Sequence, residues 1–311
     1  MLSKVAGRMY WLARYLERAE NSARLLGVYD SLLLDMPPDA GIGWGQALET
    51  LGVSEDVRAE REQAGERAML EYLLLDPDNP GSLLGSLDAA RENARTTRDV
   101  VPNEAWRTIN ELFLFGRDKL PRLLDVGQRF EVLSNVIGRC QQITGLLHGT
   151  MSHGPAYQFV RIGRSLERAD MTTRLIDVAA AVLLSGRSEL RRYDNRLWMA
   201  ILRSLSGYQM YRQYVRRRII GADVIAFLLQ DAEFPRSVRC CLADMDAAVE
   251  KLPGHNSCRR DVAAVAARVE GLDTSNLDAA GIHGLIDGLQ LSFAGLDQVV
   301  FATWLSPDLA A

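Results

Sequence analysis

The chain has little of the residue types on which metal, redox and disulfide chemistry depends. Its 311 residues include only four cysteines and four histidines. No CxxC spacing occurs, and Cys240 and Cys241 are adjacent, which argues against a disulfide framework and favours a reducing compartment. No HExxH sequence and no cysteine–histidine cluster with zinc-ligand spacing is present. We therefore expect a cytoplasmic protein with no metal centre and no cofactor.

Long apolar runs, a strong net charge and nucleotide-binding loops are missing as well. The longest apolar run, about Val178 to Leu184, is far shorter than the roughly 20 residues of a membrane helix. The net charge of −4 favours neither nucleic acid nor an anionic membrane surface. The Gly-rich stretch 41–45 has no strand pattern before it and no Lys-Ser or Lys-Thr after it. These absences argue against a membrane, nucleic acid or ATP as a partner of this chain.

What the sequence does contain is an internal repeat. The segment Arg14 to Glu20 reads RYLERAE, and Arg164 to Asp170 reads RSLERAD, 150 residues later. We interpret the repeat as a tandem duplication, in which residues 1–150 and 151–311 form two repeats of one domain. Further matches follow in the same order at offsets of 154 and 155 residues: Trp44 with Trp198, Leu73 to Asp76 with Leu228 to Asp231, and Pro80 to Leu87 with Pro235 to Leu242.

Helical periodicity dominates the chain. Apolar residues recur at i, i+3, i+4 and i+7 in segments such as 112–123, 132–147 and 262–269, and alternating β-rich runs are scarce. Pro80 and Pro235 are expected in the first turn of a helix, where a missing N–H costs nothing. We predict an all-α protein, a pseudo-two-fold bundle of about ten to twelve helices with antiparallel neighbours.

Each repeat carries a helix with the same order of acids and arginines on one face. With about 100° per residue, Arg14 and Arg24 fall within about 60° of Glu17, and apolar side chains fill the opposite arc. The second repeat shows the same arrangement around Glu167. The candidate residues of this face are Arg14, Glu17, Arg18 and Arg24 in the first repeat, and Arg164, Glu167, Arg168 and Arg174 in the second.

Two interpretations of this polar face stay open. An exposed amphipathic helix carries i,i+3 and i,i+4 ion pairs of this kind, each worth a few tenths of a kcal/mol. The order of charges is the same in both repeats, however, which favours a constrained network inside the protein or at an interface. Such a network could hold the halves together through bidentate arginine–carboxylate pairs. It could also bind an anion, with Glu17 or Glu167 as the catalytic base.

A second candidate site precedes a helix of the second repeat. The segment from Asp231 to Arg239 contains Pro235, Arg236 and Ser237. Turn chemistry accounts for such a sequence, and so does an exposed helix N-terminus that binds an anion with the help of Arg236. Asp231, Arg236 and Ser237 are therefore candidate binding residues.

These motifs resemble the Alpha-E domain family, a bacterial all-helical family named for its Glu-Arg motif. The resemblance covers essentially the whole chain. It implies a helical fold and partners rather than a reaction: a circularly permuted ATP-grasp ligase, sometimes fused to the domain, and transglutaminase-like and proteasome-like peptidases. The residues that carry it are Tyr10 to Leu12, Arg14 to Asn21, Asp78 to Pro80, Ala90 to Asn93, Leu166 to Asp170, Asp231 and Phe234 to Val238.

Two functional hypotheses follow. The first is an accessory or interaction protein that works with the ATP-grasp-type ligase in peptide or amide-bond synthesis or modification, since 311 residues leave no room for a ligase domain. The alternative is a stand-alone enzyme acting on a peptide or amino-acid carboxylate, with Glu17 or Glu167 as base and arginines as anion clamp. A closed ion-pair lattice favours the first. A solvent-open pocket lined by both Glu-Arg pairs favours the second.

Overall fold

A computed structural model of the chain describes residues 3–35, 43–125, 127, 129–184, 194–275 and 277–306. Over these ranges the chain forms fourteen α-helices and no β-strand, so the all-α prediction is confirmed. The predicted ten to twelve helices are too few, because the stretches after the two longest helices break into short ones. Gly65, for example, separates α3 (Glu55–Ala64) from α4 (Glu66–Leu74) with a φ of +94°, which glycine adopts without a Cβ clash.

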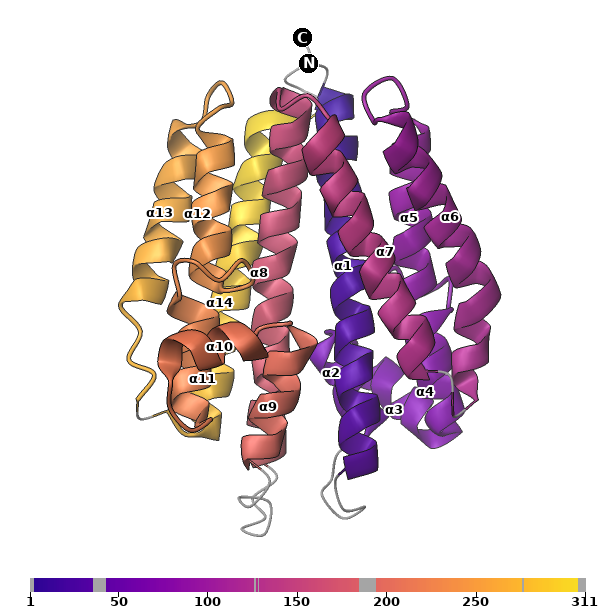
Figure 1. The fold of residues 1–311 in the computed structure, drawn as a ribbon, viewed down its shortest axis with the longest axis vertical. Helices are drawn as coiled ribbons and strands as arrows, with labels where there is room; N and C mark the ends of the chain where they lie inside the picture. Colours follow the sequence, from indigo (N-terminus) through magenta and orange to yellow (C-terminus); the bar gives the residue numbers. More distant parts are fainter. Residues whose placement is uncertain are drawn as a thin grey trace.

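Two long helices form the centre of the molecule. α1 (Ser3–Asp35) and α8 (Pro155–Leu184) lie side by side and pack against each other more extensively than any other pair of described helices (Figure 1). Each is flanked by a similar group. α5 (Leu83–Arg95) and α7 (Arg129–Thr150) pack on α1, with α6 (Asn103–Lys119) outside them, while α12 (Val238–Val249) and α14 (Ala279–Val300) pack on α8, with α13 (Asn256–Glu270) outside them.

Short helices connect the two groups at one end of the bundle. α2 (Trp44–Thr50), from the first predicted repeat, contacts α8, and α9 (Asp194–Ser204), from the second, contacts α1. α10 (Tyr208–Val215) and α11 (Gly221–Gln230) continue from α9. Each group therefore covers part of the other's central helix. The predicted boundary near residue 150 falls at the turn between α7 and α8, and the tandem duplication itself stays a prediction.

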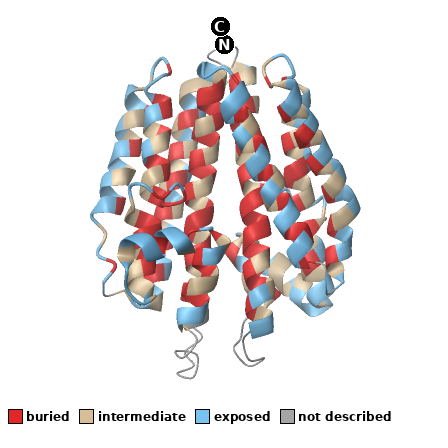
Figure 2. Cartoon of the chain, viewed as in Figure 1, coloured by how far each residue is buried: buried red, intermediate tan, exposed pale blue. Residues whose placement is uncertain are grey.

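α1 is buried on its polar side as well as on its apolar side. Glu17 and Glu20 are 2% and 1% exposed, as deeply buried as Leu16 and Ala19. Figure 2 shows buried residues along both central helices, between the flanking ones. The interpretation of the polar arc as a solvent-exposed surface is therefore wrong. Because a buried carboxylate is costly unless it is paired, these acids need partners inside the protein.

Serines rather than prolines begin the helices that follow the two Pro-containing loops. Ser82 Oγ and Ser237 Oγ accept hydrogen bonds from the backbone N–H three residues on, at 3.2 and 3.0 Å, at the starts of α5 and α12. Pro80 and Pro235, predicted in the first helical turn, lie two residues before these caps. The prediction is wrong because a serine hydroxyl satisfies a free N–H at the helix start, and a proline ring has no acceptor to offer it.

One described helix has the length and composition of a membrane span. The stretch Ala279–Leu305 joins α14 to a π-helical turn, η4 (Phe301–Leu305), and its mean hydropathy is 1.2. A helix that packs in a bundle through one apolar stripe passes the same test. α14 buries such a stripe, which includes Ile282, Ile286 and Leu289, and it contacts α8 and α13. Length and composition alone therefore do not place this helix in a membrane.

Candidate functional site

The two Glu-Arg sequences meet between the central helices. Arg168 on α8 donates from Nε and Nη2 to the two carboxylate oxygens of Glu17 on α1, at 2.8 Å each. In the reverse direction, Arg18 on α1 donates to both oxygens of Glu167 on α8, at 2.6 and 3.1 Å. Each helix thus supplies the acid of one pair and the arginine of the other. Both pairs have the bidentate geometry in which guanidinium and carboxylate bind most strongly.

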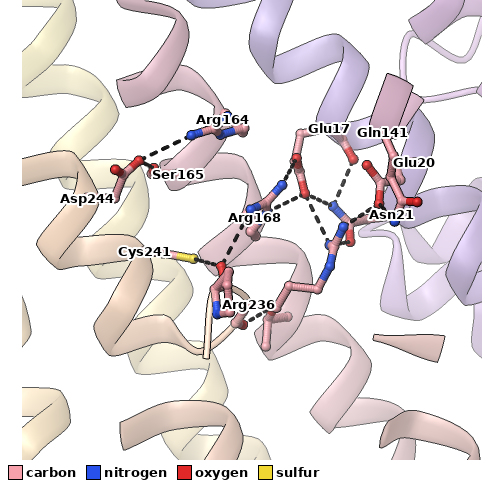
Figure 3. Close-up of polar contacts among 12 residues, drawn as sticks. Glu17, Glu20, Asn21, Gln141, Arg164, Ser165, Arg168, Arg236, Cys241 and Asp244 are labelled. Atoms are coloured by element: carbon pink, nitrogen blue, oxygen red, sulfur yellow. Dashed lines mark hydrogen bonds and ion pairs between the residues drawn. The ribbon is translucent and has the colours of Figure 1, made fainter. Parts of the chain in front are cut away.

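A second arginine reaches each of these carboxylates. Arg14 Nε donates to Glu167 at 2.7 Å, and Arg236, in the loop before α12, donates to Glu17 at 3.3 Å. Asn21 Nδ2 donates to Glu17 at 2.9 Å (Figure 3). The side chains of Glu17 and Glu167 are both 2% exposed. Protein donors, rather than water, therefore neutralise and solvate both charges.

The arginines determine the protonation state of the two glutamates. Burial raises the pKa of Glu17, but the charges of Arg168 and Arg236 outweigh it and lower the pKa to about 2. The pKa of Glu167 is lowered in the same way, against burial, by Arg18 and Arg14. Both carboxylates are therefore ionised at neutral pH and hold their protons too weakly to act as efficient general bases.

Two further arginines link the central helices to the short helices. Arg24 donates to the backbone carbonyl of Ser204, the last residue of α9, and Arg174 donates to that of Thr50, the last residue of α2, at 2.9 Å. Cations are favoured at a helix C-terminus, where carbonyls lack partners. The acidic partners of these arginines are Glu20 for Arg24, at 2.8 Å, and Asp170 for Arg174, at 2.9 Å. We call the following set the central ion-pair network: Arg14, Glu17, Arg18, Glu20, Arg24, Glu167, Arg168, Asp170, Arg174 and Arg236.

The network leaves only a small cavity of about 10 Å³ at Glu17 and a larger one beside Glu167. On the first side, the guanidinium of Arg236 lies against the carboxylate (Figure 3). On the second side, a cavity of about 210 Å³ reaches the network. Glu17 and Arg168 do not line this cavity, so it is not a pocket shared by both Glu-Arg pairs. The charged residues that line it are Arg18, Glu167, Asp170 and Arg174, and Gly81 of the loop before α5 borders it as well.

One known family model matches nearly the whole chain. A family model described as a predicted alpha-helical domain with a conserved ER motif matches residues 1–305. The chain belongs to the Alpha-E family. The dipeptides at 17–18 and 167–168, which form the reciprocal pairs of the central ion-pair network, are Glu-Arg sequences of the kind that this description names.

Proteins similar to this Alpha-E chain occur in mycobacteria. Uncharacterized proteins of Mycobacterium bovis and of two strains of Mycobacterium tuberculosis are 25% identical to it over 275 residues. The match covers 83% of this chain and 30% of each relative. The Alpha-E chain therefore spans about a third of the length of these relatives. No solved structure matches it.

Three candidate residues of the Alpha-E chain lie outside the central ion-pair network. Arg164 turns toward Asp244 on α12, at 3.5 Å (Figure 3), and its buried Nε has no partner among the described residues. Asp231 Oδ1 accepts two backbone N–H bonds within its own loop, at 2.9 and 2.7 Å. Ser237 is fully buried and caps α12. The geometry of Asp231 and Ser237 shapes the loop that carries Arg236.

Arg236 points away from the site predicted for it. One of the two interpretations of its sequence context was an exposed helix start that binds an anion, and the other was turn chemistry. The residue is instead 7% exposed and donates to Glu17, Glu20 and, at 3.1 Å, Asn21 on α1. The exposed anion-binding interpretation is wrong, because the guanidinium is drawn inward by buried carboxylates that need a cationic partner.

Two aspartates at the edges of the site were not predicted. Asp297 on α14 accepts hydrogen bonds from Tyr10 and Arg14, and Asp244 on α12 accepts one from Ser165 at 2.7 Å. A signal for Asp297 exists in the sequence, since it is the only charged residue between positions 289 and 306. No cluster of three or more metal-ligating side chains occurs within the described ranges.

Proposed function

We propose that this chain is a non-catalytic assembly module, an accessory protein that works with a circularly permuted ATP-grasp-type ligase in peptide or amide-bond synthesis or modification. The ligase, and a transglutaminase-like protein as a further partner, are what the family resemblance implies. The observation that carries the non-catalytic part is the saturation of Glu17 and Glu167, each bound by two arginines and 2% exposed. Carboxylates saturated by arginines in this way are suited to holding helices in place.

The alternative, an enzyme that uses Glu17 or Glu167 as its base, has less support. A general base needs a free lone pair within reach of the substrate and a pKa near the working pH. Glu17 fits neither requirement well, because both oxygens accept hydrogen bonds inside the protein, its side chain is 2% exposed, and its pKa is about 2. Glu167 borders a cavity, but Arg14 and Arg18 bind its carboxylate.

The lengths of the relatives also support a module. The match covers 30% of each mycobacterial relative, so in those proteins an Alpha-E region forms part of a longer chain. A helical unit of this kind, stabilised by its own internal ion pairs, is suited to lie beside another functional domain.

Co-purification and activity measurements test the proposal. The chain is mixed with the ATP-grasp-type ligase of the same organism, and in a parallel sample with the transglutaminase-like protein. We expect a complex with the ligase in size-exclusion chromatography, and ligase-dependent ATP hydrolysis that changes when the chain is added. A chain that forms or cleaves amide bonds alone, or one that neither binds nor affects the ligase, would overturn the proposal.

Glu17→Gln separates the two functional hypotheses within that assay. If Glu17 is structural, the variant melts earlier but supports the ligase normally below its melting temperature. If it is a catalytic base, turnover is lost while thermal stability is retained. Glu92→Gln, in an exposed ion pair with Arg95, is the matched control and should change neither property.

A further inference from the structure

Gly81 and Arg236 occupy equivalent places in two similar loops. They lie 155 residues apart, and each immediately precedes the serine that caps the next helix. The loops also share a turn, in which Asp76 Oδ1 and Asp231 Oδ1 each accept the backbone N–H two residues on, at 2.9 Å. The helices that follow pack in the same way, α5 on α1 and α12 on α8. The main difference at this point is that one loop carries a guanidinium and the other carries no side chain.

Arg236 shows what that place is suited to hold. Its guanidinium binds Glu17, Glu20 and Asn21 on α1. The residues 150 positions later, on α8, are Glu167, Asp170 and Met171. Both acids are thus present on the other side, and Met171 replaces the amide with an apolar surface. Gly81 reaches none of them with a side chain.

The cavity of about 210 Å³ lies at this place. Gly81, Glu167, Asp170 and Met171 all line it. Its volume is far above the roughly 15 Å³ that a single water needs, and it has room for the four heavy atoms of a guanidinium. The first loop therefore leaves open the space that Arg236 fills beside the second.

Ser22 supplies an independent sign that the cavity takes a polar group. Its side chain is buried, lines the cavity and makes no hydrogen bond to any described residue. Buried hydroxyl groups are nearly always hydrogen-bonded in folded proteins. Thr172, 150 residues later, is satisfied, because its hydroxyl donates to the backbone carbonyl of Arg236 at 3.0 Å. A ligand in the cavity can supply the hydrogen bond that the hydroxyl of Ser22 lacks.

One free carboxylate oxygen of the cavity suits a cation. Asp170 binds Arg174 through Oδ2, which leaves Oδ1 without a partner among the described side chains. The two lining arginines, Arg18 and Arg174, are already bound to carboxylates. Glu167 already accepts from Arg14 and Arg18, so the open counterpart of Glu20 is Asp170. A guanidinium in the cavity would bind Asp170 as Arg236 binds Glu20, whereas an incoming anion would face this free carboxylate oxygen.

We propose that this cavity binds a guanidinium group, carried by an arginine that is either a free amino acid or part of a peptide, in the position that Arg236 takes on the other side. The inference does not depend on the ligase partnership. A chain that binds guanidinium groups without binding the ligase, or the reverse, is a distinguishable result.

Calorimetric titration of the full chain tests the proposal with matched probes. The guanidinium probes are L-arginine and N-acetyl-L-arginine amide, and citrulline is a neutral compound of nearly the same shape. We expect at least one guanidinium probe to bind. Citrulline should bind at least about tenfold more weakly, because a charge-assisted pair is lost. Preference for free arginine indicates an amino-acid ligand, and preference for the capped form indicates a peptide.

Gly81→Arg provides an internal competitor for the same space. An ideal Cβ at Gly81 comes closest to Asn79 Oδ1, at 3.2 Å, and Gly81 is not among the glycines with positive φ. We expect the variant to melt no earlier than wild type and to bind the guanidinium probes at least about tenfold more weakly. Gly138→Arg, at an exposed position of α7 with open space around it, adds the same charge and should leave binding unchanged.

Asp170→Asn provides a second variant that does not depend on filling the cavity. Loss of one carboxylate charge should weaken guanidinium binding about tenfold. The proposal is overturned if no guanidinium probe binds, or if citrulline, or the anion acetate titrated in parallel, binds as tightly as arginine. It is also overturned if Gly81→Arg and Asp170→Asn, both folded by circular dichroism, bind the probes as wild type does.

Discussion

At the scale of single residues, Glu17 shows how this protein keeps a charge in its interior. Its carboxylate accepts from Arg168, Arg236 and Asn21, so both oxygens are satisfied although the residue is 2% exposed. Breaking such a buried pair is costly, because the remaining charge is neither paired nor solvated by water. The stability of the protein should therefore depend on the charge of Glu17 and not only on its shape.

Replacing Glu17 by glutamine tests this dependence. The substitution keeps the size and removes the charge, which leaves the buried guanidinium of Arg168 without a carboxylate partner, whereas Arg236 keeps Glu20. We expect a loss of about 3 to 5 kcal/mol in the free energy of unfolding, measured by urea denaturation. A variant as stable as wild type would contradict the expectation, and the exposed Glu92→Gln serves as the control.

The depressed pKa of Glu17 makes a second prediction, on pH dependence. A carboxyl whose folded pKa lies below its ordinary value of 4.5 adds stability above that value and loses it as the pH falls through the folded pKa, about 2 here. A depression of this size corresponds to roughly 3 kcal/mol. Wild type should therefore lose stability between pH 4.5 and 2, and the gap to Glu17→Gln should narrow over that window. A gap that stays constant with pH would contradict this account.

At the scale of helices and turns, the ends of α2 and α9 are built alike. Thr50 and Ser204, their last residues, each present a carbonyl to an arginine from the opposite central helix. Two residues later the chain turns with positive φ, +80° at Gly52 and +55° at Ser206. The turn and the arginine together hold each short helix against the central pair.

Gly52→Ala tests the contribution of this turn. A Cβ at φ +80° is strained by about 1 to 2 kcal/mol, and it would lie 3.3 Å from Arg174 Nη1. We expect that loss of stability in thermal or urea unfolding, with faster amide hydrogen exchange in α2. Gly27→Ala, within α1 and with open space around it, should instead stabilise the protein by about 0.5 to 1 kcal/mol. Equal effects of the two alanines would rule out the turn as the cause.

The helices could be predicted from sequence better than their ends could. Apolar periodicity depends only on neighbours along one helix, so the α7 segment around Val132 to Leu147 was found correctly. The serine caps at Ser82 and Ser237 were missed, because Pro80 and Pro235 carry the stronger local signal and which group finally satisfies the first N–H is decided by the folded loop. Breaks such as Gly65 depend on packing that the sequence does not display.

At the scale of the whole molecule, the two halves are linked through their centres. Glu17 takes its arginines from α8 and the loop before α12, whereas Glu167 takes its arginines from α1. α2 and α9 each contact the other half's central helix. Without the other half, Glu17 and Glu167 would lose their arginines, and each central helix would lose part of its cover.

Separate expression of residues 1–150 and 151–311 tests this dependence. Alone, each half leaves a buried acid without the arginines of the other, so we expect weak helical signal and no cooperative unfolding by circular dichroism. Mixing the two should restore both, with a one-to-one complex in size-exclusion chromatography. A half that melts alone at the temperature of the intact chain would contradict the prediction.

The sequence predicts which residues form the centre of the site, but not how they pair. The repeated order of acids and arginines identified Glu17, Arg18, Glu167 and Arg168, because that order is visible along each helix. It did not show that each acid pairs with the other helix's arginine, which depends on how α1 and α8 pack. The sequence around Arg236 allows a turn or an exposed helix start, and it does not show the buried carboxylates on α1 that Arg236 binds.

The central claim is that the reciprocal pairs hold the two central helices together. A double-mutant cycle between Glu17 and Arg168 tests this claim most directly. The free energy of unfolding is measured for wild type, Glu17→Gln, Arg168→Gln and the double variant. We expect a coupling of about 2 to 3 kcal/mol, with the double variant less destabilised than the sum of the two single ones. A coupling near zero, together with loss of ligase-linked activity in a fully stable Glu17→Gln, would contradict the structural role and favour a catalytic one.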